Sequence, residues 1–247
     1  MVRLALIMTT IATNLHQIHA RLQQACVDAE RAPDSVALLA VSKTFGPEAV
    51  HEAALQGQRD FGETYIQEAV EKIALLREMD GPGGQPLRWH CIGPIQSNKT
   101  RLVAEHFDWA HSVDRLKIAQ RLSDQRPEGM APLQVCLQVN PDGGATKAGV
   151  PPEEALALAQ AVALLPNLQL RGLMAIPEEA EDFAAQYAVH RRMKQLFDSI
   201  AASAAPGLAA FDTLSLGMTA DLEAAVQAGS TLVRVGRGIF GGRVRAG

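Results

Sequence analysis

The sequence has few cysteines, no surplus of charge of either sign and no long apolar run. Its three cysteines, Cys26, Cys91 and Cys136, lie far apart, which is typical of reduced cytosolic thiols and argues against a disulfide framework. The net charge of -4 gives no general attraction to nucleic acid or to anionic membrane. No segment could span a bilayer, and the apolar stretch at residues 1–8 is too short for a signal peptide. We therefore expect a cytoplasmic protein that binds neither nucleic acid nor membrane.

Several catalytic and metal-binding motifs are also missing. No set of His, Asp or Glu residues has the spacing of a zinc site, and no G-x-S-x-G elbow accompanies Ser42. No glycine-rich fingerprint follows the first predicted strand, as a dinucleotide-binding sheet would normally have. His16, His19, His106 and His111 are interpreted as solvated or capping residues. These absences argue against a serine hydrolase, a zinc enzyme and a dinucleotide-binding fold.

The main positive signal is an alternation of short apolar runs with longer helical patterns. A chain of 247 residues with 47% hydrophobic content can bury a large core. Eight runs are predicted as strands, at 36–43, 59–63, 87–93, 109–113, 132–140, 168–176, 211–216 and 232–236. Helices are predicted between them at 47–57, 64–79, 96–106, 114–125, 152–164, 180–203 and 219–228. Eight parallel strands predict one (β/α)8 TIM barrel domain over 1–247, preferred to a doubly wound open sheet.

A further amphipathic helix is predicted ahead of the first strand. It covers residues 11–31, ends before Pro33 and is expected to cap the lower face of the barrel. Because Met8 begins a polar stretch, residues 1–7 are hypothesised to be an extension from an upstream start.

Lys43 stands at the end of the first predicted strand, where an apolar run meets a loop. Partial desolvation at such a place favours the neutral, nucleophilic amine, which can form a Schiff base with an aldehyde. The alternative is a lysine that extends its ammonium group into water, as most lysines at strand ends do.

The loops after the seventh and eighth predicted strands are rich in glycine and hydroxyl groups. Gly217, Gly236 and Gly238 allow backbone N–H groups to approach an anion, and Ser215 and Thr219 add hydroxyl donors. The same glycines would also suit ordinary tight turns. Because barrel enzymes usually bind phosphate in these two loops, the pattern predicts a phosphate site.

A phosphate site across the rim from a Schiff-base lysine calls for a ligand with an aldehyde and a phosphate. Pyridoxal 5'-phosphate (PLP) has both groups. Arg234, on the last strand, is then expected to face the pyridine nitrogen and keep it unprotonated, which weakens the ring as an electron sink. The alternative for Arg234 is an ordinary ion pair with a carboxylate.

Several long motifs, in this order, resemble those of the pyridoxal phosphate homeostasis proteins, which are short barrel relatives of alanine racemase. They lie at 40–44 (AVSKT), 61–68 (FGETYIQE), 89–99 (WHCIGPIQSNK), 171–175 (RGLMA), 214–219 (LSLGMT) and 233–241 (VRVGRGIFG). The resemblance implies a fold-type III barrel without the C-terminal β domain, and a cofactor held on Lys43. It also implies that Ser215 and the Gly236–Arg237 backbone hold the phosphate and that Arg234 lies near the pyridine nitrogen.

The full set of residues expected to bind the cofactor combines the strand ends with these motifs. It comprises Ser42, Lys43, Glu63, Thr64, His90, Asn140, Met174, Ser215, Gly217, Met218, Thr219, Arg234, Gly236 and Arg237. Two positions depart from the family pattern, which usually has Asn in place of Thr64 and more often Ser or Thr in place of Arg237. These departures change individual side-chain contacts and leave Lys43 untouched.

Three functions remain open at this point. The resemblance favours a PLP carrier that stores the cofactor and delivers it to apo-enzymes, with little or no turnover, as a monomer or weak dimer. An amino-acid racemase would need a proton donor opposite the lysine, for which Tyr65, expected on the rim beside His90, is the candidate. A third reading is a Schiff-base aldolase for phosphorylated sugars. Lys147 and Lys99 are candidates for a second PLP site.

Overall fold

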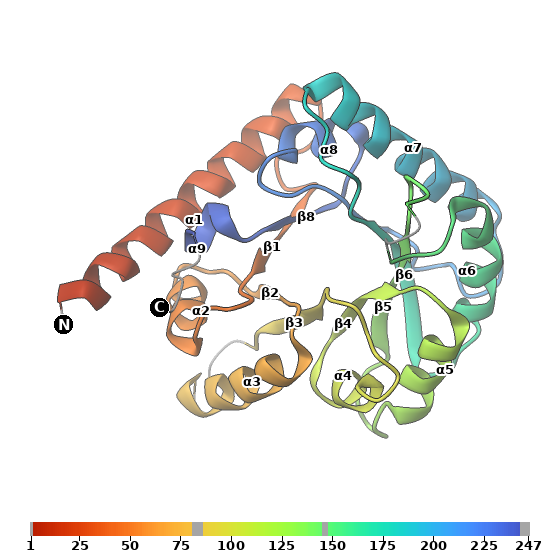
Figure 1. Ribbon diagram of the computed structural model, residues 1–247, viewed down its shortest axis with the longest axis horizontal. Helices are drawn as coiled ribbons and strands as arrows, with labels where there is room; N and C mark the ends of the chain where they lie inside the picture. The colour runs from red at the N-terminus through yellow and green to blue at the C-terminus, as the bar shows by residue number, and fades with distance from the viewer. Residues whose placement is uncertain (1, 81–85, 145–147, 243–247) are drawn as a thin grey trace.

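Eight parallel strands form a closed barrel in which each strand pairs with its neighbours in the sequence and β8 pairs with β1 (Figure 1). The computed structural model describes residues 2–80, 86–144 and 148–242. The strands are β1 (Ala37–Val41), β2 (Asp60–Glu63), β3 (Arg88–Cys91), β4 (Trp109–Val113), β5 (Leu133–Val139), β6 (Leu168–Ala175), β7 (Thr213–Ser215) and β8 (Leu232–Val235). The predicted barrel is confirmed.

The strands are mostly shorter than the apolar runs that predicted them. The run at 36–43 gives a strand that ends at Val41, so Ser42 and Lys43 belong to the loop that follows. Strand β1 is fixed from both sides, because Leu39 is paired in register with Arg234 of β8 and Val41 with Gly62 of β2. The loop after β1 therefore starts beside the ends of both neighbouring strands.

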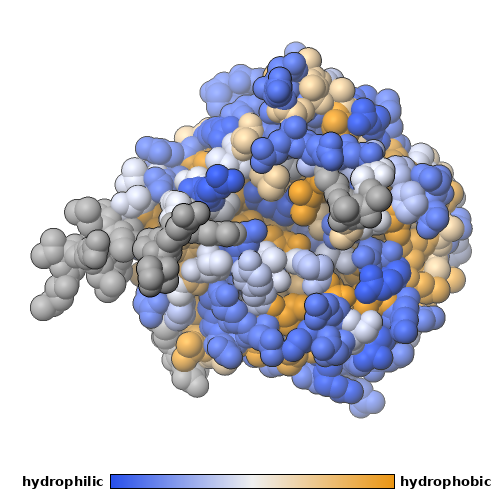
Figure 2. All heavy atoms as spheres, in the orientation of Figure 1, coloured by the Kyte–Doolittle hydropathy of each residue, from blue (hydrophilic) through white to orange (hydrophobic). Residues whose placement is uncertain are grey.

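The helices cover the outside of the barrel in the order that the sequence predicts, except that the last one, α9 (Arg237–Phe240), was not predicted. The others are α2 (Pro47–Leu55), α3 (Ile66–Asp80), α4 (Thr100–His106), α5 (Leu116–Gln125), α6 (Ala155–Ala163), α7 (Phe183–Ala202) and α8 (Leu222–Ala228). A short 3-10 turn, Pro152–Glu154, precedes α6. Figure 2 shows hydrophilic side chains over much of one face, with apolar side chains between them. The apolar sides of these helices pack on the strands and form the main core.

Helix α1 (Val2–Asp28) lies in the outer layer and packs against α2, α8 and α9 (Figure 1). Its side chains Ile11, Leu15 and Leu22 are buried on that side. The Asn14 amide also donates to the Ile239 carbonyl oxygen at 3.0 Å. The expectation that this helix caps the lower face was wrong. Because α9 is only one turn long, α1 takes the place of a full outer helix after β8.

In the part of the chain that the structure describes, no helix is long and apolar enough to cross a membrane. The same residues contain no cluster of His, Cys, Asp or Glu that could hold a metal ion. All three cysteines are buried and free. Burial raises the pKa of the Cys91 and Cys136 thiols to about 12.

Candidate functional site

The site begins where β1 and β8 end side by side. Lys43, two residues after β1, is half-buried, as an amine at a strand end is expected to be. Gly236 directly follows the neighbouring strand β8. A Cβ added to it would lie 3.2 Å from the Val41 carbonyl oxygen, so the backbone after β8 passes very close to the end of β1. The lysine and the glycine turn, which were predicted separately, thus share one part of the rim.

A buried ion pair between Glu63 and Lys72 supports the loop that follows β1. The Ser42 hydroxyl donates to Glu63 Oε1 at 2.7 Å, and Lys72 Nζ donates to the same oxygen at 2.7 Å and to the Ser42 carbonyl oxygen at 3.1 Å. From the side, the Thr44 N–H donates to Glu68 Oε1 at 3.1 Å. Thr44 has φ of 70°, a left-handed conformation that non-glycine residues rarely adopt. These contacts fix the backbone on both sides of the lysine.

Glu63 was predicted to contact the cofactor, and the structure places it beneath the loop instead of at its surface. Glu63 is 1% exposed, and burial raises the pKa of its carboxyl although the Lys72 ammonium opposes the shift. Its second oxygen, Oε2, has no hydrogen-bond partner among the described residues. Sequence reasoning missed Lys72, although its spacing from the buried Ala69 and Leu76 put it on the inner side of α3.

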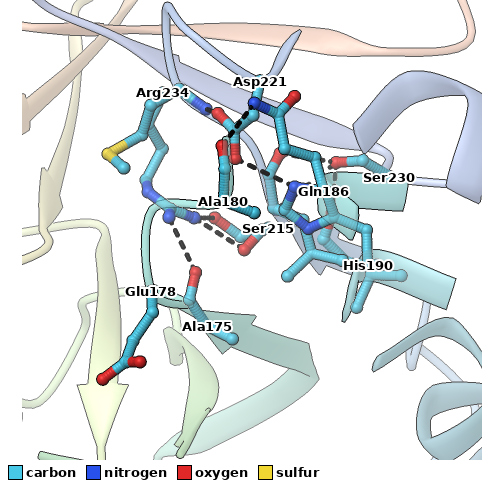
Figure 3. Close-up of polar contacts among 12 residues, drawn as sticks. Ala175, Glu178, Ala180, Gln186, His190, Ser215, Asp221, Ser230 and Arg234 are labelled. Carbon is cyan, nitrogen blue, oxygen red and sulfur yellow. Dashed lines mark hydrogen bonds and ion pairs between the residues drawn. The ribbon is translucent and has the colours of Figure 1, made fainter. Parts of the chain in front are cut away.

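The Arg234 guanidinium is buried inside the barrel and is held by oxygen acceptors from neighbouring strands (Figure 3). Its Nη1 donates to the Ser215 carbonyl oxygen at 2.6 Å and to the Ser215 hydroxyl at 2.7 Å, and Nη2 donates to the Ala175 carbonyl oxygen at 2.8 Å. Arg234 Nε donates no hydrogen bond to any described residue, so it remains available to a ligand. Burial lowers the pKa of Arg234 to about 10, so the group is still charged at neutral pH.

His90 and His111 lie deeper in the barrel. His90 Nε2 is 3.0 Å from Asp60 Oδ1, and His90 Nδ1 is 2.9 Å from His111 Nε2. His111 Nδ1 is in turn 3.3 Å from the Ser215 hydroxyl. Both rings are fully enclosed, so the interpretation of His111 as solvated or capping was wrong. Both nitrogens of His90 already have partners, and its predicted contact with the cofactor gains no support from this geometry.

The loop after β7 has the turn that its glycine predicted. Gly217 has φ of 90°, and a Cβ there would lie 2.5 Å from the Ala225 Cβ. The Met218 N–H donates to Asp221 Oδ1 at 2.7 Å, and Asp221 Oδ2 is 2.9 Å from His190 Nε2 (Figure 3). Burial alone would raise the pKa of Asp221, but these hydrogen bonds lower it overall. Helix α8 therefore begins after Asp221, three residues later than its predicted start at Thr219.

The remaining predicted residues line the same rim at different depths. Thr64 is half-buried, and its carbonyl oxygen would collide with any Cβ at Gly93. Asn140 is half-buried; its Nδ2 donates to the Gly144 carbonyl oxygen at 3.0 Å, while its Oδ1 is buried without a partner among the described residues. Met174 is fully buried and is paired in register with Ser215.

The other candidates differ in exposure. Thr219 is half-buried, whereas Arg237 is exposed. Tyr65 is 49% exposed, whereas His90, beside which it was expected, is enclosed. Lys99 is half-buried just before α4, and Lys147 lies outside the described residues.

Residues 13–244 match the family of the alanine racemase N-terminal domain. A pyridoxal phosphate homeostasis protein from Pseudomonas aeruginosa is 55% identical over 236 residues, which cover 96% of this chain and 97% of the relative. Proteins of the same name from Vibrio cholerae and Escherichia coli K12 are 50% and 49% identical over 96% of this chain and 98% of each relative.

Solved structures show the same likeness. PipY of Synechococcus elongatus, whose structure has PLP bound, is 36% identical with a TM-score of 0.80, and the match covers 94% of this chain and all of PipY. Alanine racemase from Corynebacterium glutamicum has a TM-score of 0.65 at 18% identity, over 97% of this chain and 63% of the racemase. At that identity the racemase shows a shared fold alone.

Proposed function

We propose that this chain, which belongs to the family of pyridoxal phosphate homeostasis proteins, binds PLP at the rim of its barrel. We further propose that it stores this cofactor and delivers it to other proteins. The observation that carries the proposal is the half-buried Lys43 beside the glycine turn after β8. The same residues lie in motifs that the family shares, and PipY, a relative at 36% identity, has a structure with PLP bound.

The residues at this rim fit the cofactor. Lys43 supplies the amine, and the turns at Gly217 and Gly236 offer the close backbone approach that a phosphate needs. Arg234 Nε has no hydrogen-bond acceptor among the described residues and suits the pyridine nitrogen. PLP, when bound, supplies an aldehyde that reacts reversibly with an amine.

The protein's own groups favour holding the cofactor over turning substrates over. Arg234 stays charged at neutral pH and would keep a proton off the ring nitrogen, which leaves the ring a weak electron sink. The racemase alternative requires a proton donor above the ring, and Tyr65 is exposed at the start of α3. The curated relatives carry the name of homeostasis proteins, and the racemase alternative is not favoured. We therefore propose a carrier with little or no turnover.

The first test is the absorbance spectrum of the purified protein, followed by borohydride reduction and peptide mapping. A yellow protein with its label on Lys43 is expected, and Lys43→Ala should abolish both the colour and the label. Lys117→Ala, which changes an exposed lysine on α5, is the matched control. Wild-type protein that stays colourless with added PLP would refute the proposal. A colourless protein is also what the alternative, a sugar-phosphate aldolase, predicts.

A second test separates a carrier from an enzyme. Loaded protein should transfer PLP to an apo-enzyme faster than an equal concentration of free PLP does. Incubation with L-alanine in deuterated buffer should give little exchange of the α-proton; fast exchange with loss of optical activity would establish a racemase.

We further propose that the protein works in the cytoplasm, which its buried free thiols support. We also propose that it is a monomer or weak dimer, which sizing chromatography would test.

A further inference from the structure

A continuous line of polar side chains crosses the barrel interior from the start of β2 to the end of β8. It runs from Asp60 through His90, His111 and Ser215 to Arg234, with successive separations of 3.0, 2.9, 3.3 and 2.7 Å. We call these five residues the interior network. Apart from Asp60, whose side chain is 17% exposed, its members are at most 4% exposed. The proposed function uses only Arg234 of these five.

The direction of the hydrogen bonds in this network follows from its end groups. Burial lowers the pKa of His90 and lowers that of His111 well below its usual range, so both rings are neutral and each carries one ring proton. The charged groups that act on them are Asp60, Asp108 and Arg88 on one side and Arg234 on the other.

The Asp60 carboxylate can only accept, so the proton of His90 is on Nε2. His90 Nδ1 must then accept from His111 Nε2–H, which leaves His111 Nδ1 as an acceptor. The partner of that acceptor is the Ser215 hydroxyl.

We infer that Asp60, His90 and His111 are positioning residues, which direct the Ser215 hydroxyl proton away from the ligand and make its oxygen an acceptor for Arg234. The inference rests on the proposed function, because Arg234 is the group that faces the cofactor. It assigns Ser215 to the support of the guanidinium and leaves the phosphate to the backbone of the glycine turns and to Thr219. Ser215 is fully buried, consistent with a support beneath the site.

The network also explains how the buried Arg234 cation is stabilised although no carboxylate of the described residues contacts it directly. Among the described residues, the Arg234 guanidinium donates to three neutral oxygens, two of Ser215 and one of Ala175. Hydrogen bonds that all point toward Asp60 polarise one another, which makes the Ser215 oxygen a better acceptor for the guanidinium. Removal of a middle member should therefore loosen Arg234 although nothing near the lysine has changed.

The first experiment reads the tautomers directly, by nitrogen-15 NMR of histidine-labelled protein without cofactor. His90 and His111 are both expected as neutral rings with the proton on Nε2. A proton on Nδ1 of His111 would overturn the inference. This measurement does not depend on PLP binding, so its outcome stands apart from that of the proposed function.

The second experiment compares the affinity for PLP with that for pyridoxal, which has the same aldehyde and ring without the phosphate. Ser215→Ala should weaken both by about the same factor, about fivefold for one lost hydrogen bond. A loss confined to PLP would make Ser215 a phosphate ligand and overturn the inference, as would unchanged affinity for both. A wild-type protein that binds both compounds equally would instead refute the phosphate site of the proposed function.

His111→Phe keeps a ring in the same space and removes both nitrogens. It should release PLP about fivefold faster than wild type and preserve the preference for PLP over pyridoxal. His106→Phe, a half-buried histidine outside the network, is the matched control. Release at the wild-type rate would overturn the inference; should this variant fail to fold, Ser215→Ala and the NMR measurement still decide.

Discussion

Lys72→Met should strongly destabilise the protein, because it leaves the Glu63 carboxylate buried without its cation. The two side chains, 2.7 Å apart, are 4% and 0% exposed, so solvent screens the pair very little. Removal of one partner of a buried pair typically costs about 3–5 kcal/mol of unfolding free energy. Methionine fills a similar volume, which limits the contribution of a cavity. For a chain of this size the loss corresponds to a fall in Tm on the order of 10 °C.

The loss should depend on pH with a defined sign. Burial raises the pKa of Glu63 above its value in the unfolded chain, and removal of Lys72 raises it further. A group with a raised folded pKa favours folding below its unfolded pKa and loses that contribution as pH rises through the folded pKa. The deficit of Lys72→Met relative to wild type should therefore be larger at about pH 8 than at about pH 5.

Urea unfolding at both pH values measures this effect. Glu63→Gln added to Lys72→Met should restore at least half of the lost free energy, because a neutral amide is easier to bury than an unpaired carboxylate. Arg101→Met is the matched control, since its pair with Glu105 is largely exposed and should contribute only about 0.5 kcal/mol. A deficit for Lys72→Met no larger than that of the control, or one that does not change with pH, would show that the pair is not buried as described.

Two other predictions test the interior packing. Cys91 and Cys136, whose pKa burial raises to about 12, should not react with a thiol reagent at mildly alkaline pH until urea unfolds the protein; rapid labelling of native protein would contradict this. Gly172→Ala should prevent folding or lower the Tm severely, because Gly172 has φ of 158° and a Cβ there would collide with the Thr213 carbonyl oxygen. Wild-type circular dichroism and Tm for that variant would be the contrary result.

The order and type of the elements could be predicted because each strand and each helix carries its own pattern. The alternation of apolar runs and helical segments gave the barrel, and the strand ends gave Lys43 and the glycine turns. The exact ends of helices were harder to predict where contacts with distant residues are involved. Helix α8 starts after Asp221, whose carboxylate bonds to the Met218 N–H before the helix and to His190, which lies thirty-one residues away in the sequence.

The groups missed by sequence reasoning are polar residues that the fold buries. His111 lies on β4 between Ala110 and Ser112, and this local sequence does not reveal whether its side chain faces the helices or the barrel interior. Its role depends on His90 and Ser215, which come from two other strands. Lys72 likewise became visible only when Glu63 and Ser42 were placed beside it. Distances between strands are set by closure of the barrel, and no local pattern encodes them.

The position of α1 has a consequence for the order in which the protein is made. Ile11, Leu15 and Leu22 are buried in a helix that packs on α2, α8 and α9, and two of these three helices come from the last part of the chain to leave the ribosome. The earliest segment therefore keeps an apolar side uncovered until synthesis is nearly complete. A nascent chain that stalls before residue 222 would leave that side open to chaperones or to aggregation.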